Sequence, residues 1–211
     1  MSSYDMKKIV LLSRKSFLAK IQTHIAKIEI NKIKKNIIDI HYSSSVGDKD
    51  LSAKAWEQHG FGIFTNSLSK KLVSKEADVV VHSYKDLPVK NLNKTSFVCL
   101  KRDDPRDIIL IKRSSLNKKK LVIGTSSPRR KYYLKKLKEF LPYQELKSIQ
   151  IRGNVPSRLE KVLNSSKEDG LFIAKAAIDR ILKYGQKIDK KEYKNFRLNF
   201  EYHFSWMLID F

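Results

Sequence analysis

Short apolar runs, polar turns and amphipathic stretches follow one another along the first half of the chain. KKIVLL (7–12) has the pattern of a buried strand, and the polar SRKS after it leads into an amphipathic helix from Ser16. NIIDIHYS (36–43) alternates like a second strand. The valine run DVVVHS (78–83) is typical of a central parallel strand that is covered on both faces. This half therefore predicts an α/β lobe.

The second half repeats this order. SFVCL (96–100) and DIILI (107–111) predict two strands separated by KRDDPR. Each of three further strands, LVIG (121–124), SIQIR (148–152) and GLFIA (170–174), leads through a turn into a helix. Repeated strand–turn–helix units predict an α/β protein with mainly parallel or mixed sheets.

The same pattern predicts two lobes. We expect a first domain over 1–100 and a second over 101–190, joined by a linker within 101–120 that includes a run of three lysines. The tail after Lys187 has no clear period. Within it, FRLNFEYHF suggests a returning strand, so 196–211 is expected to complete the first domain.

Charge narrows the classes of ligand. The chain has 44 Lys and Arg against 22 Asp and Glu, a formal net charge of +22. A polyanionic partner, a substrate rich in carboxylates, or simply a lysine-rich surface would each fit this balance. The lysines are scattered and accompany no nucleic-acid-binding motif, and no apolar run reaches the roughly 18 residues of a membrane span. We therefore expect no nucleic-acid partner, no membrane and a cytoplasmic location.

Arginine is more informative than lysine. The sequence has 34 lysines and 10 arginines, yet arginines occupy the short Gly-, Ser-, Thr- and Asn-rich segments SRKS, GTSSPRR and RGNVPSR. The guanidinium binds carboxylate or phosphate through two parallel hydrogen bonds, which lysine cannot do. These segments follow predicted strands, at the sheet edge where α/β proteins bind ligands. They predict an anion site between the two lobes, although helix capping and local ion pairs would also explain them.

One acid stands out among these basic segments. Asp86 lies in HSYKDLP, directly after the valine strand. A carboxylate among bound anions and arginines can donate a proton and then stabilise a cationic intermediate. The alternative is an ordinary turn aspartate before Leu-Pro.

VVVHSYKDLP, KRDDPRD, GTSSPRR, IRGNVPSR and the AAIDRI helix, in this order and spacing, resemble the hydroxymethylbilane synthase (porphobilinogen deaminase) family. The likeness runs from about Lys8 to about Gly185. It implies two periplasmic-binding-protein-like lobes and a transferase of porphyrin and heme biosynthesis. That enzyme joins four porphobilinogen molecules into hydroxymethylbilane and releases ammonia, on a dipyrromethane cofactor fixed to a cysteine through a thioether.

The resemblance also assigns roles to residues. Asp86 matches the catalytic aspartate that protonates the departing amine. Arginines that bind the acetate and propionate groups of substrate and cofactor are matched by Arg14, Arg129, Arg130, Arg152, Arg158 and Arg180. Further substrate- or cofactor-binding positions are Ser16, Ser83, Lys85, Thr125, Ser126, Ser127, Gly153 and Asn154. No metal is expected.

Two departures from the family pattern qualify this assignment. The family's GGKGLFTKEL loop reads HGFGIFTNSL, which places Phe61 and Asn66 where lysines are expected. The third domain and its cofactor cysteine are not recognisable. Cys99 is expected to be a buried, inert thiol in the strand 96–100, not an attachment point. The alternatives to a monomeric enzyme are a chain complemented by a separate C-terminal domain and a non-catalytic binder of anionic pyrroles or other carboxylates.

Overall fold

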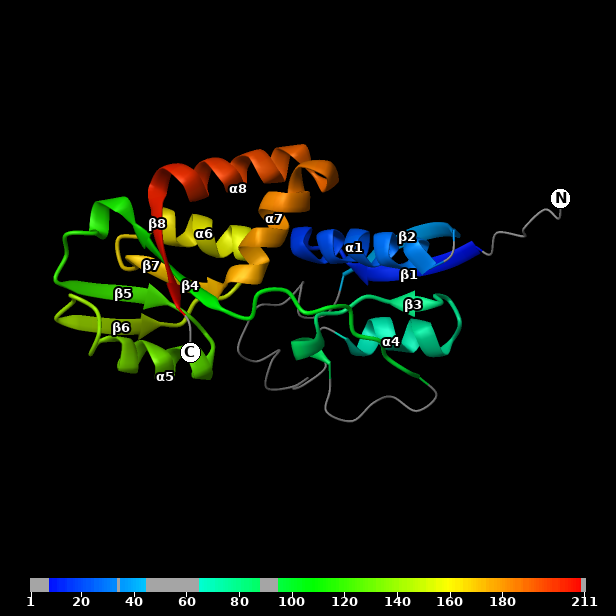
Figure 1. Cartoon of the computed structure of the whole chain (residues 1–211), viewed down its shortest axis with the longest axis horizontal. Coiled ribbons are helices and arrows are strands. Elements are labelled where there is room, and N and C mark those ends of the chain that lie inside the picture. The colour runs from blue at the N-terminus through cyan, green and yellow to red at the C-terminus, as the bar shows by residue number, and fades with distance from the viewer. Residues whose placement is uncertain (1–7, 34, 45–64, 88–94, 210–211) are drawn as a thin grey trace. The chain divides into compact units, whose positions relative to one another are not determined.

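A computed structural model of the chain is shown in Figure 1. The chain folds into two compact units, unit 1 (Met1–Arg102) and unit 2 (Asp103–Phe211), and each has a sheet of its own. The residues that the structure describes are 8–33, 35–44, 65–87 and 95–209.

The described part of unit 1 contains a three-stranded parallel sheet in the order β2-β1-β3. Its strands are β1 (Lys8–Arg14), β2 (Ile37–Ser43) and β3 (Val79–Val80). The register places Leu12 of β1 beside Val80 of β3. The middle of these three strands is therefore β1, and not the valine run to which the sequence pattern assigned the central place.

Both faces of β1 are covered, as its apolar run requires. Leu12 packs with Leu68 of helix α4 (Asn66–Val73). Leu11 points to the opposite face because side chains alternate along a strand, and helix α1 (Phe17–Ile33) covers that face (Figure 1). This packing fixes the carboxyl end of β1, where Arg14 lies.

Unit 2 contains a five-stranded mixed sheet in the order β6-β5-β7-β4-β8. Its strands are β4 (Asp107–Lys112), β5 (Lys120–Gly124), β6 (Glu145–Ile149), β7 (Gly170–Ala174) and β8 (Phe204–Ile209). β5 runs parallel to β6 and to β7, whereas β4 runs antiparallel to both of its neighbours, β7 and β8. The α/β class with parallel and mixed sheets is thus confirmed.

Helices cover both faces of this sheet (Figure 1). They are α5 (Pro128–Leu137), α6 (Val155–Leu163), α7 (Lys175–Ile188) and α8 (Lys190–His203). Leu134 and Leu137 of α5 pack with Ile109, Ile123 and Phe172 of the sheet. On the other face α7 contacts β4 and β7, and α8 packs against α6 and α7.

Two strand predictions were wrong. Residues 96–100 form no strand, and Cys99 is exposed rather than buried, because nothing pairs with this segment in the described part of the chain. Residues 196–203 belong to α8, in which Phe196 and Phe200 stack one helical turn apart with ring centroids at 5.9 Å.

The expected return of 196–211 to the first domain also needs correction. β8 pairs with β4 in the sheet of unit 2, with Ile111 opposite Ser205 and Asp107 opposite Ile209. The open side of the antiparallel strand β4 accepts it there. Phe61 lies outside the described residues, while Asn66 begins α4. In the part of the chain that is described, no helix is long and apolar enough to cross a membrane.

Candidate active site

The carboxyl ends of β1 and β3 bring two of the predicted segments of unit 1 together. Arg14 is the last residue of β1, and Ser83 to Asp86 follow β3 closely. The two strands are parallel neighbours, so both ends lie at the same edge of the sheet. We call Arg14, His82, Ser83, Lys85 and Asp86 the Asp86 cluster.

Asp86 faces two cations without direct contact. One carboxylate oxygen lies 4.0 Å from Nη1 of Arg14, and the other lies 4.0 Å from Nζ of Lys85. Asp86 ends a short 3₁₀ helix, and its backbone N–H donates to the Ser83 carbonyl at 2.9 Å. Its side chain keeps 21 % of its surface exposed, so the carboxylate remains accessible to a ligand.

Gln22 of α1 holds the loop in place, and Ser16 lies at the start of the same helix. The Gln22 side-chain amide of α1 donates to Ser83 Oγ at 2.9 Å. Ser16 precedes α1, and its carbonyl accepts from the Lys20 N–H at 3.0 Å. Sequence reasoning missed Gln22, since a glutamine inside an amphipathic helix carries no signal of what it contacts.

His82 is the second residue that sequence reasoning missed, although it stands within the quoted motif. Its partial burial and the nearby charge of Arg14 lower the pKa of the imidazole to about 4. Its Nε2 atom is buried and has no hydrogen-bond partner among the described residues. The Asp86 cluster therefore contains a histidine that is neutral at pH 7.

In unit 2, the GTSSPRR loop joins β5 to α5. Ser127 caps α5 by accepting from the Arg130 N–H, and Pro128 stands at the first helical position. Thr125 is buried, and its N–H donates to the Ile149 carbonyl at 2.8 Å. Ser126 Oγ donates to the Ile151 carbonyl at 2.6 Å. These three residues shape the loop, and their contact with a ligand stays a prediction.

Arg129 and Arg130 share one buried carboxylate. Nη2 of Arg129 donates to Asp107 at 2.6 Å, and Nη2 of Arg130 donates to the other Asp107 oxygen at 2.9 Å. Asp107 is only 3 % exposed. The sequence left open that these arginines pair with acids of the chain. One nitrogen of Arg129 and one nitrogen of Arg130 do so.

The RGNVPSR loop brings a third arginine to this pair. Gly153 has a φ of +122°, which side-chain-bearing residues rarely adopt, and Asn154 caps α6 by accepting from the Ser157 N–H. Nε of Arg158 donates to the Gly153 carbonyl at 2.7 Å. Burial and then the charge of Arg130 lower the pKa of Arg158. We call Arg129, Arg130 and Arg158 the arginine cluster.

The other two predicted arginines of unit 2 have different surroundings. Arg180 on α7 donates to Asp103 through Nε at 2.7 Å. The carbonyl of Arg152 accepts from Lys161 Nζ at 2.9 Å. Sequence reasoning gave the aspartates of KRDDPRD no role, although Asp103 and Asp107 neutralise predicted ligand-binding arginines. The available signal was three acids grouped in a strongly basic chain.

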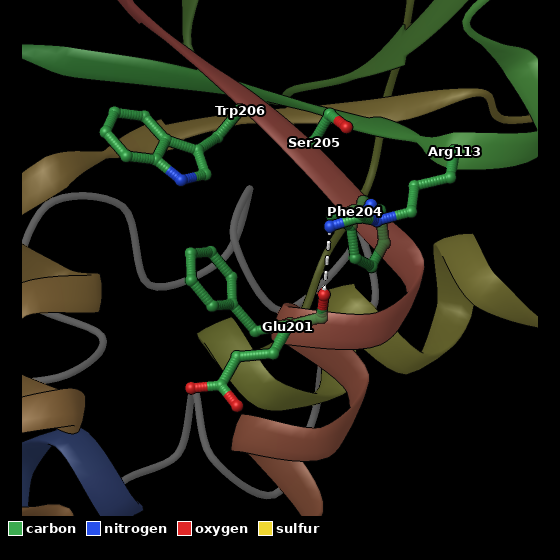
Figure 2. A pocket seen from close by; sticks show the side chains of 6 residues that line it. Arg113, Glu201, Phe204, Ser205 and Trp206 are labelled. Atoms are coloured by element: carbon green, nitrogen blue, oxygen red, sulfur yellow. Dashed lines mark hydrogen bonds between the residues drawn. The ribbon is translucent and has the colours of Figure 1, made fainter.

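An open hollow of about 420 Å³ lies elsewhere in unit 2, at the junction of α8 and β8. Figure 2 shows Trp206 and Ser205 on the strand and Glu201 on the helix, with Arg113 donating to the Glu201 carbonyl at 3.3 Å. None of the predicted site residues lines this hollow. The Asp86 cluster of unit 1 and the arginine cluster of unit 2 remain the candidate site residues, each within its own unit.

Comparison with known proteins agrees with the motifs. The family model described as "Porphobilinogen deaminase, dipyromethane cofactor binding domain" matches residues 9–199. The chain belongs to the porphobilinogen deaminase family. The porphobilinogen deaminase of Ruminiclostridium cellulolyticum is 36 % identical over 178 residues, which cover 83 % of this chain and 59 % of that protein. The probable porphobilinogen deaminase of Picrophilus torridus is 38 % identical over 173 residues, 80 % of this chain and 58 % of that protein.

These identities confirm the resemblance, and the coverages show how much of each relative the chain matches. A porphobilinogen deaminase of Coxiella burnetii is 34 % identical over 180 residues and is covered over 56 % of its length. The chain thus spans less than two thirds of the relatives it matches. The family's cofactor, named in the family model, is a dipyrromethane.

Proposed function

We propose that this chain carries out porphobilinogen deaminase chemistry, joining four porphobilinogen molecules into hydroxymethylbilane with release of ammonia. The observation that carries the proposal is the Asp86 carboxylate, which is accessible and faces Arg14 and Lys85 at 4.0 Å within a chain of this family. In this reading the chain is a cytoplasmic, monomeric transferase of porphyrin and heme biosynthesis.

Asp86 would move one proton in each condensation. The protonated carboxyl gives its proton to the substrate's amine as the C–N bond breaks, and ammonia leaves. The carboxylate then stabilises the positive charge left on the pyrrole ring. When a pyrrole carbon attacks the methylene group, that carbon loses its proton to Asp86, and the carboxyl is restored. No other proton donor is needed.

The arginine cluster would bind the acid groups. Each porphobilinogen carries an acetate and a propionate, so every addition brings two more carboxylates. The guanidiniums of Arg129 and Arg130 use one nitrogen each on Asp107 and keep their other nitrogens for a ligand. Arg158 adds a third, largely desolvated cation.

The dipyrromethane cofactor fits this donor set. Nε of Arg130 is buried and has no partner among the described residues, so a donor is left for an acid group. Arg129, Arg130 and Arg158 would hold the cofactor's carboxylates. When bound, the cofactor supplies the pyrrole carbon to which the first substrate joins.

We further infer that each unit is a periplasmic-binding-protein-like lobe. Unit 2 supports this inference because one antiparallel strand, β4, interrupts an otherwise parallel sheet whose two faces are both covered by helices. Arg14, Arg152 and Arg180 are proposed as further carboxylate ligands. Ser16, Ser83, Lys85, Thr125 and Asn154 are proposed as supporting contacts.

The test is consumption of porphobilinogen by the purified 211-residue chain, with ammonia and hydroxymethylbilane measured together. We expect Asp86→Asn to lower the rate by at least about 100-fold, because the proton donor is lost. Asp39→Asn is the matched control, since Asp39 is a partly exposed aspartate of the same unit that pairs with Lys8 and His41.

The outcomes separate the hypotheses. A wild-type rate in Asp86→Asn would contradict the catalytic role of Asp86. Calorimetric binding of porphobilinogen without consumption would favour the non-catalytic binder. Consumption that begins only when a C-terminal domain from a relative is added would support complementation by a separate chain.

A further inference from the structure

We propose that Asp107 is a positioning residue, which holds Arg129 and Arg130 in the orientation that binds carboxylates. The inference rests on the proposed function in that the ligand is taken to be porphobilinogen. It gives a role to Asp107, which lies within KRDDPRD and received no role from the sequence. Asp107 acts through the arginines and does not itself touch the ligand.

The topology places Asp107 at the correct edge of the sheet. β4 runs antiparallel to β7, so its first residue, Asp107, lies opposite Ala174, the last residue of β7. β5 is parallel to β7 and also ends at this edge, from which the GTSSPRR loop leads into α5. The strand that runs the other way thus brings an acid to the edge where ligand-binding loops gather.

Two kinds of contact hold the guanidiniums of Arg129 and Arg130. Asp107 takes one Nη2 from each guanidinium, at 2.6 Å and 2.9 Å. The Arg129 guanidinium also lies over the Tyr133 ring, 5.6 Å from its centroid, and that of Arg130 lies 5.9 Å from the centroid of Phe172. Each guanidinium is therefore held by an acid and a ring.

Charge explains why an acid is needed here. Arg129 and Arg130 are neighbours in sequence, and Arg158 is close enough for the charge of Arg130 to lower its pKa. The like charges of these neighbouring guanidiniums repel one another, and partial burial strengthens the repulsion. Without Asp107, the half-exposed Arg129 side chain is free to turn toward water, and the ligand must then order it on binding.

Unit 2 offers a matched control aspartate. Asp169 is 4 % exposed, against 3 % for Asp107. It accepts hydrogen bonds from Ser115, Lys118 and the Val122 N–H, at 2.8, 2.6 and 2.9 Å. It precedes β7, whereas Asp107 lies level with the end of β7, so the two acids lie at opposite ends of that strand. The two aspartates are equally buried but have different partners. An effect seen only when Asp107 is replaced is therefore due to its arginines and not to a general loss of packing.

The experiment compares Asp107→Asn with Asp169→Asn in the full chain. Porphobilinogen binding is measured by calorimetry, and the rate of modification by phenylglyoxal is measured at each arginine by mass spectrometry. We expect Asp107→Asn to weaken binding at least tenfold and to speed modification of Arg129 several-fold. Asp169→Asn should change neither, although it lowers the melting temperature. Unchanged or tighter binding in folded Asp107→Asn would overturn the proposal.

A measurement on the wild-type chain covers the case in which Asp107→Asn does not fold. Arg129 and Arg197 are both 54 % exposed, but the partner of Arg197 is the exposed Glu201. Held by a buried acid, Arg129 should be modified several-fold more slowly than Arg197. Equal rates would contradict the positioning role. If wild-type protein binds no porphobilinogen, the proposed function fails, while the modification rates still decide the role of Asp107.

Discussion

The two clusters use the same pair of chemical groups in opposite ways. In unit 1, Arg14 and Asp86 lie 4.0 Å apart, and both side chains are 21 % exposed. In unit 2, Arg129 and Arg130 approach Asp107 to 2.6 and 2.9 Å, and that carboxylate is almost fully buried. Under the proposed function, the loose, accessible pair leaves the Asp86 carboxylate to act on a ligand. The tight, buried pair uses the Asp107 carboxylate to hold the two arginines, which would then bind the ligand.

The largest expected effect that separates the clusters is on stability. Asp107→Asn should lower the free energy of unfolding by about 3 kcal/mol, because it removes the acid from a buried ion pair. Asp86→Asn should cost less than about 1 kcal/mol, because its ion contacts are long and partly solvated. Urea titration followed by circular dichroism measures both. Equal losses would mean that the two acids are equally structural, and the comparison would not hold.

The next effect concerns pH and the Asp86 cluster. His82 has a folded pKa of about 4 and an ordinary value of 6.5. Between these values the unfolded chain binds more protons than the folded one, so the free energy of unfolding rises with pH. This contribution is present above pH 6.5 and is lost as the pH falls toward 4; it amounts to on the order of 3 kcal/mol.

Replacement isolates the histidine from the other titrating groups. We expect His82→Gln to flatten the stability profile between about pH 7 and about pH 4.5 relative to the wild type. His41→Gln is the control, since His41 is exposed and pairs with Asp39 at the surface. A wild-type slope in His82→Gln would assign the pH dependence to other groups.

The smallest effect is on ligand affinity when arginine is replaced by lysine. Arg129→Lys and Arg152→Lys keep the charge but lose the guanidinium's second nitrogen, so porphobilinogen binding should weaken by about tenfold. In Arg129→Lys, a single ammonium must serve both Asp107 and the ligand. Calorimetry with Arg197→Lys as the exposed control measures the change. Wild-type affinity in both variants would count against bidentate carboxylate recognition.

Much of the fold could be read from the sequence, and each of the two errors has a physical cause. Strands such as β5 and β7 were predicted because continuous apolar runs between turn residues have few alternatives. SFVCL has a similar pattern, yet Val98 is 92 % exposed there and no strand forms. A strand needs a neighbour as well as a pattern. The helix over 196–203 was missed because its aromatic and basic residues lack a clear period.

The site divides in the same way. The sequence by itself determined the family and the α/β class, and it predicted Asp86 and the arginines as site residues, because these depend on residue types at fixed spacings. The tertiary structure alone decided that β8 joins β4, that His82 is partly buried beside Arg14, and that Asp107 reaches Arg129 and Arg130. The last contact joins residues 22 and 23 positions apart. It exists because one strand runs against its neighbours, and the direction of a strand is set by its pairing partners rather than by its own residues.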